Sequence, residues 1–335
     1  MVLSPLVAGI DLGGTKILGR LVDPAEPIRP IYEHRVDTPR GASKITDAIE
    51  SVVLALNDWS VHHPSPASDR ERARERPPIA AVGIGAAGLV DLRGVLRFAP
   101  NLPTVVDLDL GSELERRLGV PVAVDNDANC ATWAEVQLGG AQGANDAVMV
   151  TLGTGIGGGF VVGGSLQRGA FGFAGEPGHM LIDPNGPPCP CGRRGCWERF
   201  ASGSGIGRLA RDAAGAGRAD RVVELAGGDP EAVRGEHVTT AAAEGDTDAI
   251  IIVEEFAWWV AVGVANLVNL LDPEVVVIGG GLVDAGELLM QPVRSAYDGL
   301  VLAVDHRPRA RIEAARLGSE AGAIGAGLLA AAAIV

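Results

Sequence analysis

Three cysteines and one histidine lie close together in the sequence and could bind a metal ion. Cys189, Cys191 and Cys196 fall within eight residues, and His179 precedes Cys189 by ten. Three thiolates and one imidazole are the ligand set of a closed, tetrahedral structural zinc site. The alternatives are reduced, buried cysteines or a disulfide, although Cys-x-Cys spacing strains a local bridge. The spacing therefore predicts one structural Zn²⁺ bound by these four side chains.

Two glycine-rich turns could face phosphate oxygens. The first, Asp11-Leu-Gly-Gly-Thr-Lys16, places an acid at the end of a predicted strand and then a Gly-Gly turn. Backbone N–H groups and a threonine hydroxyl in such a turn can bind phosphate. The second, Thr151-Leu-Gly-Thr-Gly-Ile-Gly-Gly-Gly159, also joins two apolar runs. Either one alone could be a plain hairpin turn, but the pair favours a phosphate site with one turn from each half of the chain.

A third glycine cluster, Gly279-Gly280-Gly281, directly follows the apolar run 275–278. Ligands of open α/β sheets bind at the carboxyl ends of parallel strands, so a nucleobase or ribose could approach a backbone without side chains there. A simple turn from strand to helix is the alternative.

Acids, an amide and an imidazole recur around these motifs. The residues that could bind a polyhydroxylated ligand are Asp125, Asn126, Asp127, Glu176, His179 and Glu198. Each buried sugar hydroxyl needs both a donor and an acceptor, which this mixture supplies. A helix N-cap explains one residue of the triplet 125–127, but not all three. For Glu198, a salt bridge to Arg193, Arg194 or Arg199 is the alternative.

The elements that position these residues alternate between strands and helices. We expect strands at 6–11, 17–22, 79–84, 122–125, 147–152, 157–162 and 275–278, and helices at 42–56, 112–118, 128–138 and from about 320 to the end. The pattern predicts an α/β fold of two similar halves, a small domain at 1–125 and a large one at 126–319. The terminal helix at about 320–335 is expected to pack back on the small domain. A Pro- and charge-rich stretch at 62–78 is expected to be a peripheral loop.

Composition narrows the possible functions. With 28 basic and 42 acidic side chains, the net charge of −14 argues against binding to nucleic acid or an anionic membrane. No export signal is visible and cysteines are few, so a reducing cytoplasm is expected. The apolar stretch 256–271 is too short to span a bilayer and is expected to be a buried helix.

Taken together, the motifs resemble those of the ROK family of sugar kinases and sugar-responsive repressors. The matching segments are Asp11–Lys16, Asn126-Asp127, Thr151–Gly155, Glu176–His179 and Cys189–Glu198, in the family's order and across nearly the whole chain. Within the family, the run Cys191–Gly203 is most similar to the ATP-dependent bacterial kinases that act on glucose. The resemblance implies an actin-like, hexokinase-type fold of two α/β domains that bind ATP and sugar in the cleft between them.

The resemblance also implies a role for each matching residue. Asp127 would be the base that takes the proton of the sugar 6-hydroxyl. Sugar hydroxyls would be bound by Asn126, Glu176, His179 and Glu198. Phosphates would be bordered by Asp11, Gly13, Gly14, Thr15 and Lys16, and by Thr154 and Gly155. Adenosine would lie near Gly279, Gly280 and Gly281. Mg²⁺ would arrive with ATP, and Zn²⁺ would fix the His179 ring.

Other functions remain possible at this point. A ROK repressor senses sugar without phosphorylating it, but it carries an N-terminal helix-turn-helix domain, for which a phosphate turn beginning at Asp11 leaves no room. A kinase for N-acetylmannosamine, N-acetylglucosamine or fructose would share the same motifs. The sequence leaves open polyphosphate as donor and a homodimer against a homotetramer.

Overall fold

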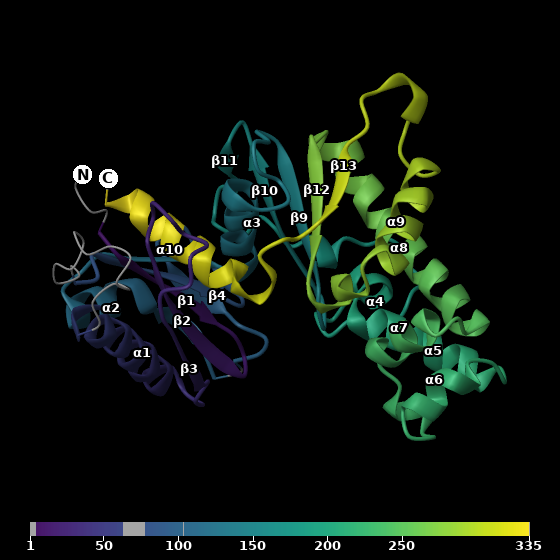
Figure 1. Ribbon diagram of the computed structural model, residues 1–335, viewed down its shortest axis with the longest axis horizontal. Coiled ribbons are helices and arrows are strands. Elements are labelled where there is room, and N and C mark those ends of the chain that lie inside the picture. The colour runs from purple at the N-terminus through teal and green to yellow at the C-terminus, as the bar shows by residue number, and fades with distance from the viewer. Residues whose placement is uncertain (1–4, 63–77, 103, 335) are drawn as a thin grey trace, which may run out of the picture. The chain divides into compact units, whose positions relative to one another are not determined.

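The computed structural model describes residues 5–62, 78–102 and 104–334 (Figure 1). Nearly all of the expected loop at 62–78 lies outside the described residues. The chain forms two compact units. Unit 1 contains residues 1–139, 166–174 and 319–335, and unit 2 contains residues 140–165 and 175–318.

Unit 1 is built on a five-stranded sheet in the order β3-β2-β1-β4-β8. Its strands are β1 (Val7–Leu12), β2 (Lys16–Val22), β3 (Glu33–Asp37), β4 (Ala81–Ala86) and β8 (Val122–Asn126). β1 and β2 form the expected antiparallel hairpin, whereas β4 pairs with both β1 and β8 in parallel. The parallel strands β1, β4 and β8 therefore end at the same edge of the sheet.

Four helices belong to unit 1: α1 (Ala42–His62), α2 (Leu110–Leu118), α3 (Asp127–Leu138) and α10 (Ala321–Ala333). Helix α10 packs on β1 and β4, as expected for the terminal helix. Glycines in the strands permit this contact, because a Cβ on Gly9 would lie 1.8 Å from the carbonyl oxygen of Ala323, and one on Gly83 would lie 1.8 Å from that of Ala326. A small sheet of β5 (Leu89–Val90), β6 (Val95–Phe98) and β7 (Val106–Asp109) completes the unit.

Unit 2 repeats the sheet of unit 1, in the order β11-β10-β9-β12-β13. Its strands are β9 (Ala147–Leu152), β10 (Ile156–Val162), β11 (Ser165–Leu166), β12 (Val275–Gly279) and β13 (Arg311–Ala314). β9 and β10 form an antiparallel hairpin, and β12 pairs in parallel with β9 and β13. The two units thus share strand order and direction, as expected for two similar halves.

The helices of unit 2 are α4 (Glu198–Ala201), α5 (Gly203–Gly215), α6 (Asp220–Leu225), α7 (Gly235–Ala243), α8 (Thr247–Leu271) and α9 (Glu287–Asp298). The buried helix expected at 256–271 is the second half of α8, which begins where the Asp246 side chain accepts a hydrogen bond from the Ala249 N–H. α8 is long and apolar enough to cross a membrane, yet 56% of its apolar window is buried inside the protein. Trp197 and Phe256 are buried in the core that surrounds it.

The division between the units differs from the expected boundary at residue 125. Helix α3 stays with unit 1 because it packs closely against α10, where a Cβ on Gly325 would lie 1.8 Å from the carbonyl oxygen of Cys130. The chain also returns to unit 1 at 166–174. Asn126 and Asp127 therefore belong to the same unit as Asp11.

Candidate active site

The first phosphate-binding candidate is the hairpin turn between β1 and β2 in unit 1. Three hydrogen bonds fix its main chain: the Gly13 N–H donates to the Lys16 carbonyl at 3.1 Å, the Thr38 hydroxyl donates to the Gly13 carbonyl at 2.8 Å, and the Thr38 N–H donates to the Thr15 carbonyl at 3.0 Å. Thr15 and Lys16 are exposed. A Cβ on Gly14 would lie 2.7 Å from the Asn101 Cβ, so this turn packs tightly on its neighbours and still presents polar groups to solvent.

Asn126 and Asp127 lie where β8 passes into α3. Asn126 is the N-cap of α3: its Oδ1 accepts from the Asn129 N–H at 3.0 Å, and its Nδ2 donates to the Gly88 carbonyl at 3.0 Å. The N-cap expected for one residue of the triplet is therefore Asn126. Oδ1 of Asp127 accepts from the Ala128 N–H at 2.9 Å, which fixes this carboxylate in the first turn of the helix.

Asp11 and Asp127 are two half-buried carboxylates that lie near each other in unit 1. Burial raises the pKa of Asp127 above its usual range. Burial, together with the negative charge of Asp127, raises the pKa of Asp11 from 3.8 to about 6, although Lys16 opposes this rise. Perturbed acids gathered in one place are typical of sites that transfer protons or bind cations.

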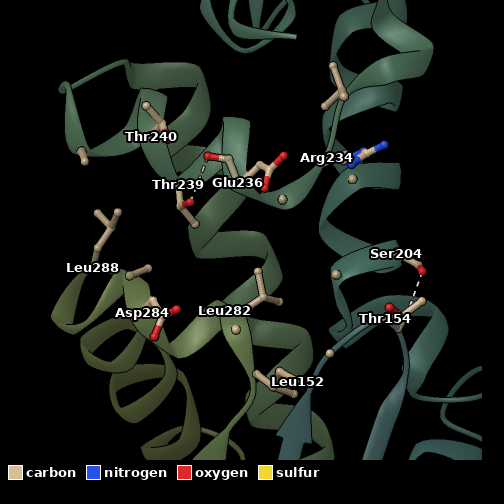
Figure 2. Close-up of a pocket in the computed structure, with 18 of the residues that line it drawn as sticks. Leu152, Thr154, Ser204, Arg234, Glu236, Thr239, Thr240, Leu282, Asp284 and Leu288 are labelled. Atoms are coloured by element: carbon tan, nitrogen blue, oxygen red, sulfur yellow. Dashed lines mark hydrogen bonds between the residues drawn. The ribbon is translucent and has the colours of Figure 1, made fainter. Parts of the chain in front are cut away.

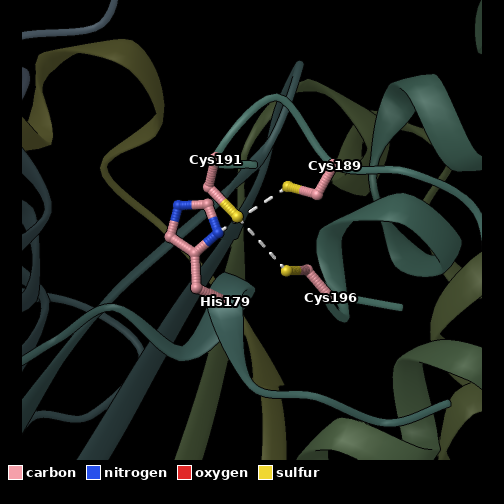
Figure 3. Close-up of side chains that lie close together, drawn as sticks. All are labelled: His179, Cys189, Cys191 and Cys196. Atoms are coloured by element: carbon pink, nitrogen blue, oxygen red, sulfur yellow. Dashed lines mark hydrogen bonds between the residues drawn. The ribbon is translucent and has the colours of Figure 1, made fainter. Parts of the chain in front are cut away.

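The four predicted metal ligands come together in unit 2 (Figure 3). All four ligand atoms lie within 4.8 Å of one another. The sulfur atoms of Cys191 and Cys196 are 3.6 Å apart, and Cys189 Sγ is 3.9 Å from His179 Nδ1. A tetrahedron with Zn–S bonds of about 2.3 Å has sulfur atoms about 3.8 Å apart, so the donor set fits a zinc ion in size and chemistry.

Short backbone contacts hold the metal-ligand loop. An antiparallel bridge joins Leu181 to Cys196, and another joins Pro188 to Arg194. The Cys189 N–H donates to the Arg193 carbonyl at 2.7 Å. His179 ends a 3-10 helix, Pro177–His179, which follows Glu176. The ring that could bind metal thus lies at the end of a short turn that starts three residues earlier at Glu176, a predicted sugar-binding acid.

Glu198 joins the metal cluster to the second glycine turn. Its Oε1 lies 3.0 Å from Cys189 Sγ and 3.9 Å from His179 Nδ1. On the other side, a Cβ on Gly155 would lie 2.5 Å from Glu198 Oε2. In the described part of the chain no salt bridge joins Glu198 to Arg193, Arg194 or Arg199, so that alternative is wrong.

A cavity of about 1280 Å³ in unit 2 lies beside the second glycine turn (Figure 2). Thr154 and Gly281 both line it, which brings together two motifs far apart in the sequence. The turn is held on the N-terminus of α5: the Ser204 hydroxyl donates to the Thr154 carbonyl at 2.8 Å, and the Gly203 N–H donates to the Gly153 carbonyl at 2.7 Å. The cavity combines polar and apolar walls suited to a nucleoside.

Sequence reasoning missed much of this cavity. Its wall also includes side chains of α7 and of the segment after β12, namely Arg234, Glu236, Thr239, Thr240, Leu282, Asp284 and Leu288 (Figure 2). None of them belongs to a motif with a recognisable spacing.

The three glycines after β12 differ in role. Gly279 is buried as the last residue of the strand and does not line the cavity. Gly280 has φ +89°, and a Cβ there would lie 2.3 Å from the Leu152 carbonyl oxygen. Gly281 faces open space at the cavity wall. Close approach of a ligand is therefore expected at Gly281, whereas Gly280 is required by the backbone.

The predicted site residues thus form two groups. In unit 1 lie Asp11, Gly13, Gly14, Thr15, Lys16, Asn126 and Asp127. In unit 2 lie Thr154, Gly155, Glu176, His179, Cys189, Cys191, Cys196, Glu198, Gly279, Gly280 and Gly281. Each group holds part of the chemistry that phosphoryl transfer to a sugar requires.

The chain belongs to the ROK family, which matches residues 7–333. A glucokinase of Streptomyces coelicolor is 40% identical over 328 residues, which cover 97% of each chain. An N-acetylmannosamine kinase of Salmonella typhi is 34% identical, with 96% of this chain and 97% of that protein covered.

A solved structure gives the same result. The ROK family glucokinase from Streptomyces griseus, in complex with glucose and AMPPNP, is 40% identical and has a TM-score of 0.80, with 97% of this chain and 99% of that chain covered. The expected fold is therefore confirmed as the actin-like, hexokinase-type α/β fold.

Proposed function

We propose that this protein is a glucokinase, which transfers the γ-phosphoryl group of ATP to the 6-hydroxyl of D-glucose. One observation carries the proposal: a half-buried carboxylate, Asp127, lies at the strand-to-helix junction beside Asn126 in a chain that is 40% identical over 97% of its length to a glucokinase. Phosphoryl transfer to a hydroxyl needs a nearby proton acceptor, together with groups that position the phosphates.

In the proposed reaction, Asp127 accepts the proton of the sugar 6-hydroxyl as its oxygen forms a bond to the γ-phosphorus. The bond from that phosphorus to the bridging oxygen breaks, and ADP leaves. Asn126, Glu176, His179 and Glu198 bind sugar hydroxyls. The hairpin Asp11–Lys16 and the turn at Thr154-Gly155 face the phosphates, and the cavity beside Gly281 receives the adenosine. Mg²⁺, bound mainly through the nucleotide, would neutralise phosphate charge.

We further propose that His179, Cys189, Cys191 and Cys196 bind one structural Zn²⁺. The metal would fix the orientation and tautomer of the His179 ring, so that its other nitrogen can meet a sugar hydroxyl. Elemental analysis of chelator-washed protein is expected to give one zinc per chain. Cys191→Ser should weaken glucose binding more than nucleotide binding, and intact activity in zinc-free protein would contradict the assignment.

A panel of sugars and phosphoryl donors tests the proposed activity. We expect kcat/KM to be highest for D-glucose with ATP. The 34% identical N-acetylmannosamine kinase makes 2-acetamido sugars the second candidate class. A higher kcat/KM for N-acetylmannosamine than for glucose would change the substrate and leave the kinase assignment in place. The panel should include fructose, N-acetylglucosamine and polyphosphate.

Location and assembly complete the proposal. We expect a cytoplasmic enzyme of glycolysis that does not bind nucleic acid or membranes. We expect a homodimer or homotetramer, which light scattering coupled to size-exclusion chromatography will distinguish.

A further inference from the structure

Three donors converge on one buried carboxylate next to the proposed base. Oδ1 of Asp125 accepts from the Asn126 N–H at 2.8 Å and from Asn129 Nδ2 at 2.9 Å. Its Oδ2 accepts from Arg168 Nε at 2.6 Å. Asp125 is only 8% exposed, whereas the Arg168 side chain is 37% exposed, so the carboxylate is the shielded partner of this ion pair. The first two bonds lie within the turn, as expected for Asp125, but the pair with Arg168 joins residues 43 positions apart.

Arg168 comes from the segment 166–174, which leaves the sheet of unit 2 and packs on unit 1. The Ala174 N–H donates to the Arg168 carbonyl at 3.1 Å and closes this segment into a compact loop. The loop lies against β5, since a Cβ on Gly172 would be 2.6 Å from the Val90 carbonyl oxygen. Two residues after the loop ends, the chain reaches Glu176.

The charges around this junction are unbalanced without Arg168. Burial raises the pKa of the Cys130 thiol, the negative charges of Asp125, Asp127 and Asp11 raise it further, and Arg168 opposes the rise, so these four charged groups all lie near this thiol. Lys16 acts on Asp11 from the hairpin. The elements packed on α3 add no titratable side chain there: β4 and α10 carry none, and Glu320 at the start of α10 pairs with Arg20. Glu135 lies at the far end of α3.

We propose that Asp125 and Arg168 are positioning residues for phosphoryl transfer: the pair fixes the turn that carries Asn126 and Asp127, and Arg168 balances the negative charge of Asp125 beside the proposed base. This proposal rests on the proposed function. Neither residue needs to touch substrate, because the Asn126 N–H is bonded directly to Asp125 and Asp127 is the next residue along the chain.

Replacement of Arg168 tests the pair. Arg168→Ala is expected to lower kcat about tenfold and to leave the KM for ATP unchanged, because the nucleotide cavity lies in unit 2. With the guanidinium gone, Asp125 loses its cationic partner, and its uncompensated negative charge should raise the pKa of the neighbouring Asp127, so the acidic limb of the pH profile of kcat/KM should move to higher pH. Arg168→Lys keeps the charge and should restore the limb and most of kcat.

Two further variants keep the test decisive. Asp125→Asn has the same shape but presents an NH₂ group to one of the three donors, so it should reproduce the kcat loss if Arg168→Ala does not fold. Arg117→Ala breaks a comparable arginine cluster, with Asp47, Glu50 and Glu113, away from the junction and should lower Tm without a change in kcat or pH profile.

The outcomes separate the two proposals. Wild-type kcat and pH profile in Arg168→Ala, or a kcat loss that Arg168→Lys does not recover, would overturn the positioning role. Absence of sugar phosphorylation by the wild-type enzyme across the whole panel would instead overturn the proposed function.

Discussion

Asp11 and Asp127 are both acidic and half-buried, yet their environments suit different tasks. Asp127 begins a helix, where the helix N-terminus and the Ala128 N–H favour its charged form against the cost of burial. Asp11 lies inside the sheet near the end of β1, opposite Leu18 and Gly85. The positive charge of Lys16 partly offsets the cost of ionising this carboxyl group. These environments support the proposed roles, in which Asp127 takes the proton and Asp11 borders the phosphates.

The role of Asp127 can be tested by one isosteric change. Asp127→Asn keeps the shape and can still hydrogen-bond a sugar hydroxyl, but it cannot accept a proton. Turnover should fall by about 10²-fold or more while glucose still binds, as measured by steady-state kinetics beside calorimetry. Asp125→Asn should lower turnover much less than Asp127→Asn does, by about tenfold. Near-normal kcat in the Asp127 variant would remove it as the base.

The raised pKa of Asp11 predicts a stability effect with a definite sign. Its pKa is about 6 in the folded protein and 3.8 ordinarily, so the fold favours the protonated form. That stabilisation is complete below pH 3.8 and is lost as the pH rises through about 6. Asp11→Asn should therefore stabilise the ligand-free protein at pH 8 by up to about 3 kcal/mol, since one pKa unit corresponds to about 1.4 kcal/mol.

Thermal unfolding from pH 4 to 8 measures this effect. The difference in Tm between Asp11→Asn and wild type should be largest at pH 8 and should shrink toward pH 4. A constant difference across the range would show that the carboxyl charge is not its source.

At the scale of elements, the end of β12 is shaped by a backbone contact rather than by side chains. Gly280 combines a positive φ with a close approach to the Leu152 carbonyl, where β9 ends. This contact brings the end of β12 against the end of β9, and Leu152 at the end of β9 lines the proposed nucleotide cavity. Neighbouring Gly281 has neither constraint.

The adjacent glycines give a matched pair of variants. Gly280→Ala should destabilise the protein by about 2 kcal/mol or more, because it adds both backbone strain and a clash with a carbonyl oxygen. Gly281→Ala should leave the free energy of unfolding nearly unchanged. Urea denaturation of both variants is the measurement, and equal losses would contradict the distinction between these positions.

At the scale of the whole molecule, the duplicated sheet divides the proposed chemistry. Unit 1 supplies the base and the first phosphate turn, while unit 2 supplies the nucleotide cavity, the second turn and the metal cluster. A change confined to the nucleotide cavity should therefore affect one ligand and spare the other.

Thr239 offers a test of this division, because it is a half-buried residue of α7 in the wall of the cavity. Thr239→Trp fills part of the space and should raise the KM for ATP about tenfold or more, with glucose binding measured by calorimetry unchanged. Thr239→Ser, which keeps the hydroxyl, should behave as wild type. Parallel loss of glucose affinity in the tryptophan variant would show that the two sites are not separate.

Elements with strong periodicity and motifs with fixed spacing could be predicted from the residues alone. The hairpin after Asp11, the helix after Asn126 and the clustering of the four candidate metal ligands were all predicted, because local geometry and ligand chemistry depend on residues close in the chain. The fold followed from the order of these motifs. The small sheet β5-β6-β7 was missed because its strands are only two to four residues long.

Contacts between distant segments form only in the folded chain and could not be predicted from the sequence. The boundary at 125 failed because α3 packs on α10, nearly two hundred residues later, through glycines that carry no periodic signal. The wall of α7 in the nucleotide cavity and the bond from Arg168 to Asp125 were hidden for the same reason. A sequence pattern indicates which face of a helix or strand is buried. Which other element packs against that face depends on the fold of the whole chain.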